Sequence, residues 1–250
     1  MKHDSPAVAL VTGGARRIGA TLVEQLHQHG YRVIIHYRHS AEEARALADR
    51  LNRQRPDSAL TAAADLGRPA DLAELARISS THWGGLDALI NNASDFYPTP
   101  VEQASEADWQ RLMASNLKGP FFLIQALLPA LRARRGCVLN MVDIHAERPL
   151  ADHPIYCAAK AGLVALTRAL ARDLGPDIRV NGIAPGAILW PEDEGGDSAF
   201  TAAEKQRLQQ LPAGRIGQPE DLAHTALFLL RQAPYITGQI LAVDGGRSLI

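Results

Sequence analysis

The chain has 250 residues, 46% of them hydrophobic and 21% charged, which suffices for a sizeable core and excludes wholesale disorder. Its 26 basic and 27 acidic side chains leave a formal net charge of -1, so bulk electrostatics give no reason to expect a nucleic acid partner. The chain has only two cysteines, which argues against a disulfide-stapled scaffold. It has no apolar run of about 18 residues, which argues against a membrane span. We therefore predict a cytoplasmic protein.

The expected elements alternate between strands and helices along the whole chain. Short apolar runs predict strands, and apolar residues at helical spacing predict helices. In chain order these are strand 7–12, helix 18–28, strand 32–37, helix 41–53, strand 60–64, helix 70–80, strand 86–91, a long helix 106–134, strand 137–142, helix 155–174, strand 178–183, helix 220–230 and strand 239–243. Because such alternation requires parallel crossovers, we expect a single Rossmann-type α/β domain over residues 1–250, with a doubly wound parallel sheet and helices on both faces.

Local signals mark two helix starts and one loop. Ser40 precedes Glu43, and Ser105 precedes Asp108, with the spacing of a capping box. Residues 187–200 are rich in glycine and acidic residues. We predict a mobile substrate loop there, and a solvated connection without a role in binding is the alternative.

A glycine-rich turn connects the first strand to the first helix. It reads Thr12-Gly13-Gly14-Ala15-Arg16-Arg17-Ile18-Gly19. Gly13 permits a tight turn, and Gly19 lets the helix pack closely on the sheet, while the free amides and the positive helix end attract a pyrophosphate. The place of this turn between a strand and a helix favours a dinucleotide site over an ordinary connection.

The end of the second strand predicts which dinucleotide binds. Sites that prefer NAD usually have an acidic residue there, which binds the ribose hydroxyls. This chain instead has His36-Tyr37-Arg38-His39-Ser40, and Arg17 lies on the nearby first turn. Because Arg38 and Ser40 offer donors suited to a 2′-phosphate, we predict NADPH rather than NADH; solvated surface arginines are the alternative. Asp65, after the third strand, could accept from the adenine amino group or simply cap a helix.

Tyr156 and Lys160 are four residues apart and therefore lie on one face of the helix 155–174. A tyrosine hydroxyl has an ordinary pKa of about 10, so it is a poor acid at neutral pH unless a cation favours the phenolate. Lys160 is such a cation, and it could also hold a ribose hydroxyl. The pair therefore suits proton donation, whereas a surface pair without function is the alternative.

Together the motifs resemble the short-chain dehydrogenase/reductase family over essentially the whole chain. The resemblance rests on the glycine-rich turn, Asn91-Asn92-Ala93, Asn116, Tyr156-Cys157-Ala158-Ala159-Lys160 and Asn181-Gly182-Ile183-Ala184-Pro185-Gly186. It implies a nicotinamide cofactor and usually a homotetramer. It also implies that Tyr156 is the acid, that Lys160 supports it and that Asn116 takes part in a water relay. Pro185 and Gly186 would lie near the nicotinamide.

Two positions depart from the pattern of this family. Arg17 stands where the family commonly has glycine, and Asp143 stands where it has a serine, thirteen positions before Tyr156. A serine hydroxyl can donate a hydrogen bond to a carbonyl oxygen, whereas an ionised carboxylate only accepts and repels the developing oxyanion. We therefore expect either an impaired enzyme or a substrate that presents N–H groups, such as a pterin.

That expectation matches a second resemblance, to the pteridine reductases, which reduce pterins and folates with NADPH. It rests on Arg17, the segment 36–40, the segment 92–100 and Met141-Val142-Asp143. It implies that Phe96 stacks on the pterin opposite the nicotinamide, although packing of Phe96 within its own loop is the alternative. It further implies that Ser94 touches pterin and cofactor, and that Asp143 and Tyr156 serve in proton delivery. Asp95 differs from the serine often found in that subfamily.

The sequence thus predicts NADPH-dependent reduction of a pterin or folate, either from a dihydropterin to a tetrahydropterin or from a pterin to a dihydropterin. The predicted catalytic residues are Asn116, Asp143, Tyr156 and Lys160. The predicted substrate residues are Ser94, Phe96, Asp143 and Tyr156. The predicted cofactor residues are Gly13, Arg17, Ile18, Gly19, Tyr37, Arg38, His39, Ser40, Asp65, Leu66, Asn92, Ala93, Ser94, Tyr156, Lys160, Pro185 and Gly186. No metal is expected, because the histidines show no ligand spacing joined to cysteine.

Two other functions stay open. A carbonyl reductase of the same fold, acting for example on 3-oxoacyl thioesters, would gain activity from Asp143→Ser, whereas a pterin reductase would lose it. A non-catalytic regulator that binds NADP would be consistent with the missing serine. Against the regulator stands the complete set of Asn116, Tyr156 and Lys160, which mere binding does not require.

Overall fold

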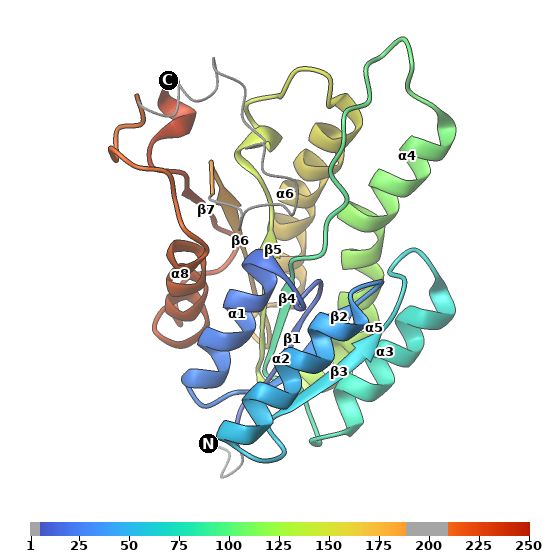
Figure 1. Cartoon of the computed structure of the whole chain (residues 1–250), viewed down its shortest axis with the longest axis vertical. Helices are drawn as coiled ribbons and strands as arrows, with labels where there is room; N and C mark the ends of the chain where they lie inside the picture. Colours follow the sequence, from blue (N-terminus) through green and yellow to red (C-terminus); the bar gives the residue numbers. More distant parts are fainter. Residues whose placement is uncertain (1–5, 189–209) are drawn as a thin grey trace.

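The computed structural model describes residues 6–188 and 210–250 of the chain. Within these residues, parallel strands form one sheet in the order β3-β2-β1-β4-β5-β6-β7 (Figure 1). The strands are β1 (Val8–Val11), β2 (Arg32–Tyr37), β3 (Ala59–Ala63), β4 (Ala88–Asn91), β5 (Cys137–Met141), β6 (Arg179–Pro185) and β7 (Ile240–Val243). This order and the parallel pairing confirm the Rossmann-type doubly wound sheet expected from the alternating elements.

Helices cover both faces of the sheet. One face carries α1 (Arg17–Gln28), α2 (Ala41–Gln54) and α8 (Pro219–Arg231). The other face carries α3 (Pro69–Thr81), α5 (Gly119–Arg134) and α6 (Pro154–Leu174), and α4 (Glu106–Met113) packs against α6. Ala9 and Val11 of β1 join the first core, and Val8 and Leu10 join the second. Because both of its faces are buried, this strand is apolar at every position rather than alternately.

The helix predicted over residues 106–134 is interrupted. The segment η1 (Ala114–Lys118) forms a π-helical turn between α4 and α5. Apolar spacing did not reveal it, because a π turn differs from an α turn by about one residue. The predicted start of this helix is confirmed, since the Ser105 hydroxyl accepts from the Asp108 N–H at 3.2 Å and the Asp108 carboxylate accepts from the Ser105 N–H at 3.0 Å. The described residues also contain the 3-10 turns η2 (Ile144–Ala146) and η3 (Arg247–Leu249).

The capping box predicted at Ser40 was wrong. Ser40 is the N-cap residue of α2, but among the described residues its side chain makes no capping hydrogen bond. Its φ of -85° and ψ of 58° depart from the extended backbone that aims an N-cap side chain at the first helical amides. The Ser40 hydroxyl is therefore left to face the pocket described below.

A crevice arises where the strand order reverses. β1 and β4 are neighbours, but β1 is followed on its other side by β2 and β4 by β5. Ligands bind outside the carboxyl ends of strands at such a point. The two loops that leave it are fastened together, because the Thr12 hydroxyl accepts from the N–H groups of Asn92 at 2.9 Å and Ala93 at 3.0 Å. In return, Asn92 Nδ2 donates to the carbonyl oxygens of Thr12 and Gly13.

Most of the substrate loop predicted over residues 187–200 lies outside the described residues, as only positions 187 and 188 are included. In the part of the chain that is described, no helix is long and apolar enough to cross a lipid bilayer. The interpretation of residues 1–250 as one domain stays a prediction.

Candidate active site

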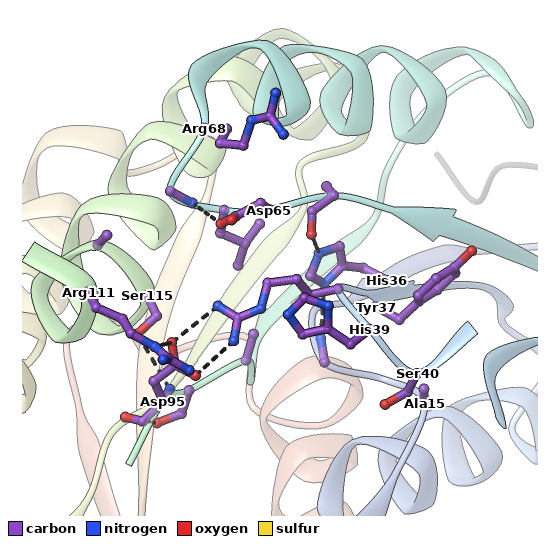
Figure 2. A pocket seen from close by; sticks show the side chains of 18 of the residues that line it. Ala15, His36, Tyr37, His39, Ser40, Asp65, Arg68, Asp95, Arg111 and Ser115 are labelled. Carbon is purple, nitrogen blue, oxygen red and sulfur yellow. Dashed lines mark hydrogen bonds and ion pairs between the residues drawn. The ribbon is translucent and has the colours of Figure 1, made fainter. Parts of the chain in front are cut away.

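A pocket of about 800 Å³ opens at the carboxyl ends of β1 to β4 and reaches α4 (Figure 2). Its volume is in the range of cofactor sites. The predicted cofactor residues that line it are Gly13, Tyr37, Arg38, His39, Ser40, Asp65, Leu66, Ala93 and Ser94. In Figure 2, Asp95 and Arg111 lie on one side of the pocket, and Tyr37 and Ser40 on the other.

Other lining residues were missed by the sequence reasoning, among them three arginines, Arg16, Arg68 and Arg111. Arg16 and Arg68 each stand within three residues of a predicted contact, so their proximity was a usable signal. Arg111 lies on α4, between the capping box at Ser105 and the predicted catalytic Asn116, and no sequence pattern singles it out. The predicted cofactor residues that do not line this pocket are Arg17, Ile18, Gly19, Asn92, Tyr156, Lys160, Pro185 and Gly186.

Two positions of the glycine-rich turn do not tolerate a side chain. Gly13 has a φ of +61°, and a Cβ at this position would lie only 3.0 Å from the Cα of Ala93. A Cβ on Gly19 would overlap the carbonyl oxygen of Gly13. The turn leads to the N-terminus of α1, whose N-cap residue Arg16 supplies no side-chain capping bond within the described residues. The close backbone approach and the positive end of α1 therefore fit a phosphate group.

Arg17 has a left-handed backbone conformation, with a φ of +52°. Such a conformation costs a non-glycine residue about 1 kcal/mol or more, which explains the glycine that the family commonly has at this position. Strained residues of this kind cluster at functional sites. The conformation is consistent with the predicted role of the Arg17 side chain at the cofactor, although this side chain does not line the pocket.

His36, on β2, connects its own strand to two other segments that line the pocket. Its Nδ1 accepts from the Gly13 N–H at 3.0 Å, which requires that Nε2 carries the proton and donates to the Ala64 carbonyl oxygen, also at 3.0 Å. Burial is the main reason why the pKa of His36 falls from 6.5 to about 4. The neutral imidazole thus connects the glycine-rich turn after β1 to the end of β3.

Arg38, which we predicted to bind a 2′-phosphate, is already paired. Its Nη1 and Nη2 donate to the two carboxylate oxygens of Asp95 at 3.2 and 3.1 Å, and Arg111 Nε donates to the same carboxylate at 3.2 Å. Burial alone would raise the pKa of Asp95, but the hydrogen bonds from Arg111 and Arg38 outweigh it and leave this pKa below its ordinary value. The sequence comparison of position 95 with a serine did not reveal this pairing.

Asp65 acts in the structure as a turn residue. Its Oδ1 accepts from the Gly67 N–H at 2.9 Å, and its own N–H donates to the Asp71 carboxylate. Asp65 nevertheless lines the pocket, so contact with an adenine amino group stays a prediction.

Asp143 and Tyr156 are in direct contact. The Tyr156 hydroxyl donates to Asp143 Oδ2 at 2.7 Å, and Asp143 Oδ1 accepts from the N–H of His145 at 2.8 Å. Asp143 precedes the 3-10 turn η2, and Tyr156 lies in the first turn of α6, so the packing of α6 against η2 sets the distance. The structure thus turns the Asp143 carboxylate toward the tyrosine that was predicted to be the acid.

The expected lowering of the Tyr156 pKa by Lys160 does not occur in this structure. The pKa of Tyr156 is raised well above its ordinary value, first by burial and then by the charge of Asp143. The Lys160 ammonium donates instead to the Met141 carbonyl oxygen at 2.9 Å, and lies 5.6 Å from the centre of the Tyr156 ring. Burial lowers the pKa of Lys160 to about 8. The lysine is therefore close to the tyrosine, as predicted, but it is directed at the backbone of β5.

Asn116 lies in the π-helical turn and is buried. Its Nδ2 donates to the carbonyl oxygens of Asp95 at 2.9 Å and Leu112 at 3.0 Å, and its Oδ1 accepts from the Ser94 hydroxyl at 2.7 Å. The visible role of Asn116 is thus to hold the segment after β4. Its predicted part in a water relay stays a prediction.

Phe96 forms part of an aromatic cluster beside Tyr156. Its ring stacks on His153 with centroids 4.7 Å apart and meets the Tyr156 ring edge to face at 4.8 Å. The side chain is 55% exposed, so a flat ligand can reach it. The sequence analysis weighed stacking on a pterin against packing within its own loop, and it missed His153, which precedes α6 and lies 57 residues away.

Among residues 6–188 and 210–250, no group of three or more His, Cys, Asp and Glu side chains is arranged to hold a metal ion.

Comparison with known proteins shows similarity along nearly the whole chain. A family model described as enoyl-(acyl carrier protein) reductase matches residues 13–248. The chain is 36% identical to pteridine reductase 1 of Leishmania tarentolae, over 97% of this chain and 96% of the relative. It is 38% identical to a Streptomyces violaceoruber protein named for a ketoacyl reductase of the granaticin polyketide synthase, over 100% of both. It is 34% identical to a 3-oxoacyl-(acyl-carrier-protein) reductase of Staphylococcus aureus, over 95% of this chain and 96% of the relative. These similar values do not select one substrate.

Proposed function

The chain belongs to the short-chain dehydrogenase/reductase family, and on this premise we propose that it reduces a pterin or folate with NADPH. The observation that carries the proposal is the 2.7 Å hydrogen bond from the Tyr156 hydroxyl to the Asp143 carboxylate. It places an acceptor-only group beside the proton donor, where reduction of a ketone needs a donor.

The charges around the pocket support the phosphorylated cofactor. Its lining contains four arginines and two carboxylates, namely Arg16, Arg38, Arg68 and Arg111 against Asp65 and Asp95. Guanidinium groups bind phosphate with strong, directional hydrogen bonds, so these arginines offer donors to a 2′-phosphate beside the carboxylates that pair with them, Glu43, Asp71 and Asp95. When bound, the reduced nicotinamide supplies a hydride to the carbon of a C=N bond in the pterin ring.

Asp143 selects a substrate by its hydrogen bonding. The N–H groups of a pterin can donate to this carboxylate, whereas the oxygen of a ketone would meet a second negative centre. Donation from the pterin also competes with Tyr156 for Oδ2 and so frees the tyrosine hydroxyl to turn toward a ring nitrogen. Ser94, which lines the pocket and also bonds to Asn116, lies on the same loop as Phe96.

Tyr156 supplies the proton that completes the reduction. Its raised pKa keeps the hydroxyl protonated at neutral pH but also makes it a weak acid, so proton transfer requires that the phenolate it forms is stabilised. The O–H bond breaks and an N–H bond forms at the ring nitrogen as the adjacent carbon gains the hydride. Once the pterin N–H groups donate to the Asp143 carboxylate, the charge of the nearby Lys160 ammonium stabilises the resulting phenolate. The phenolate then regains a proton from solvent.

The decisive measurement is NADPH oxidation with a panel of substrates. The panel contains dihydropterins, dihydrofolate, a fully oxidised pterin and acetoacetyl thioesters. Turnover of at least one pterin or folate, with no turnover of the thioesters, is the expected result. Turnover of thioesters alone would support a carbonyl reductase, as in the name of the Staphylococcus aureus relative, and cofactor binding without turnover of any pterin or thioester would favour the regulator.

The variant Asp143→Ser separates these functions further. It should lower kcat for the pterin by about 100-fold or more, because it removes the acceptor for the substrate N–H groups. NADPH affinity and melting temperature serve as controls for folding. A gain of activity on acetoacetyl thioesters together with unchanged pterin turnover would contradict the role given to Asp143.

The homotetramer and the cytoplasmic location expected from the sequence remain proposals. Light scattering coupled to size-exclusion chromatography tests the tetramer, and fractionation of cells tests the location.

A further inference from the structure

We propose that Asp95 is a specificity residue that weakens the preference of the cofactor site for a 2′-phosphorylated dinucleotide by pairing with Arg38. The inference rests on the proposed use of NADPH, because it concerns how strongly that cofactor is favoured over NADH. The segment after β2 contains no acid, but the fold brings one to Arg38 from the segment after β4.

The pairing is well defined geometrically. Both Nη atoms of Arg38 donate to the Asp95 carboxylate, at 3.2 and 3.1 Å. Such a bidentate pair is the arrangement in which a guanidinium binds an oxyanion most strongly. Only 14% of the Asp95 side chain is exposed, against 32% of the Arg38 side chain, so solvent screens the pair only in part. The carboxylate therefore occupies donors that a phosphate would use.

Hydrogen bonds hold the backbone of Asp95 in place, so its loop does not carry the carboxylate away from Arg38. The Asp95 carbonyl oxygen accepts from Asn116 Nδ2 at 2.9 Å, and the Asp95 N–H donates to the Ser115 hydroxyl at 3.4 Å. Arg111, on α4, donates from Nε to the Asp95 carboxylate at 3.2 Å. This second arginine keeps Asp95 ionised and paired when a cofactor phosphate takes donors of Arg38.

The consequence differs between the two cofactors. A 2′-phosphate must share Arg38 with a carboxylate and approach a like charge, which raises the free energy of the NADPH complex. NADH has a 2′-hydroxyl at this position. A carboxylate can accept a hydrogen bond from this hydroxyl and does not repel it. Asp95 therefore reduces the difference between the NADPH and NADH affinities that Arg38 alone would create.

Isothermal titration calorimetry on the full-length protein tests the inference with NADPH, NADH, 2′,5′-ADP and 5′-ADP as probes. Asp95→Asn keeps the shape of the side chain and removes its charge. We expect this variant to bind NADPH and 2′,5′-ADP about tenfold more tightly, and NADH and 5′-ADP within twofold of the wild type. The matched control is Glu74→Gln, which neutralises a carboxylate in another bidentate arginine pair, with Arg77 on α3, outside the pocket; it should change no affinity.

The outcomes separate this inference from the proposed cofactor. If Asp95→Asn leaves the ratio of the NADPH and NADH affinities unchanged, or lowers it, while its melting temperature shows a folded protein, Asp95 does not weaken the preference. If the wild type binds NADH more tightly and Arg38→Gln does not weaken NADPH binding, the proposed use of NADPH fails instead. The first failure is measured on Asp95→Asn, and the second on the wild type and Arg38→Gln, so the two can be distinguished.

Discussion

Acidification should weaken the fold through His36, and the variant His36→Asn isolates this effect. Burial lowers the pKa of His36 from 6.5 to about 4 in the folded protein. A base whose pKa is lower in the folded state stabilises the fold above the unfolded pKa, and this stabilisation is lost as the pH falls from 6.5 to about 4. The difference of about 2.5 pKa units, at about 1.36 kcal/mol each, limits the total loss to roughly 3 kcal/mol.

Urea denaturation at pH 7 and pH 5 measures the loss. Asparagine places Oδ1 near the position of Nδ1, so it can still accept from the Gly13 N–H, but it does not titrate. The wild type should lose about 2 kcal/mol more of its free energy of unfolding than His36→Asn between these two pH values. His27, whose pKa is also lowered by burial, is present in both proteins and cancels. Equal losses in the two proteins would refute the reasoning, because they would show that His36 does not carry this titration.

A second variant of His36 tests its connection to the cofactor site. Glutamine places Nε2 near the Ala64 carbonyl oxygen and leaves the Gly13 N–H without its acceptor. A lost hydrogen bond of about 1 kcal/mol corresponds to roughly a fivefold weaker NADPH affinity if the turn at Gly13 must be ordered for binding. His36→Asn should stay within twofold of the wild type in the same titration. If the two variants bind NADPH with equal affinity, the hydrogen bond from the Gly13 N–H to His36 does not contribute to cofactor binding.

Further predictions concern single side chains. Arg38→Gln should weaken NADPH binding by about 10- to 100-fold and NADH binding by less than twofold, measured by calorimetry; equal losses would contradict a phosphate contact. Tyr156→Phe should lower kcat by at least about 100-fold while the Kd for NADPH changes by less than about threefold, and stopped-flow turnover and calorimetry distinguish the two effects. Phe96→Ala should raise KM for a pterin by about tenfold in steady-state kinetics, and an unchanged KM would show that its ring only packs against His153. Ser105→Ala should reduce the free energy of unfolding by about 1 kcal/mol in urea with activity intact, because it removes the cap of α4.

The course of the chain through the sheet was largely predictable from local patterns. The strand expected over residues 32–37 coincides with β2, and the other expected strands differ from the structure by at most two residues at either end. Such agreement is physical, since a strand buried on both faces must be apolar throughout and is bounded by turns. The π-helical turn at Ala114–Lys118 was not predictable, because it preserves the apolar spacing on both sides.

The site was predictable where one motif supplies all the partners, and not where the fold joins distant segments. Tyr156 and Lys160 come together because they lie on one helix face. The ion pair of Arg38 with Asp95 joins residues 57 positions apart, and the stacking of Phe96 on His153 joins residues equally distant. The direction of the Tyr156 pKa was predicted wrongly, because the sequence shows neither the burial of the hydroxyl nor its contact with the Asp143 carboxylate, and both raise this pKa.

The π-helical turn also changes the phase of the helix that contains it. An α-helix rotates by about 100° per residue, so one additional residue turns everything beyond it by about that angle. α4 can therefore direct Gln110 and Arg111 to the pocket while α5 directs Leu123 and Leu127 into the core against α3 and the sheet. Deleting a single residue between 114 and 118 would restore a regular helix but force one of these two surfaces out of alignment. The irregular turn thus lets one continuous helix line the pocket at one end and pack in the protein interior at the other.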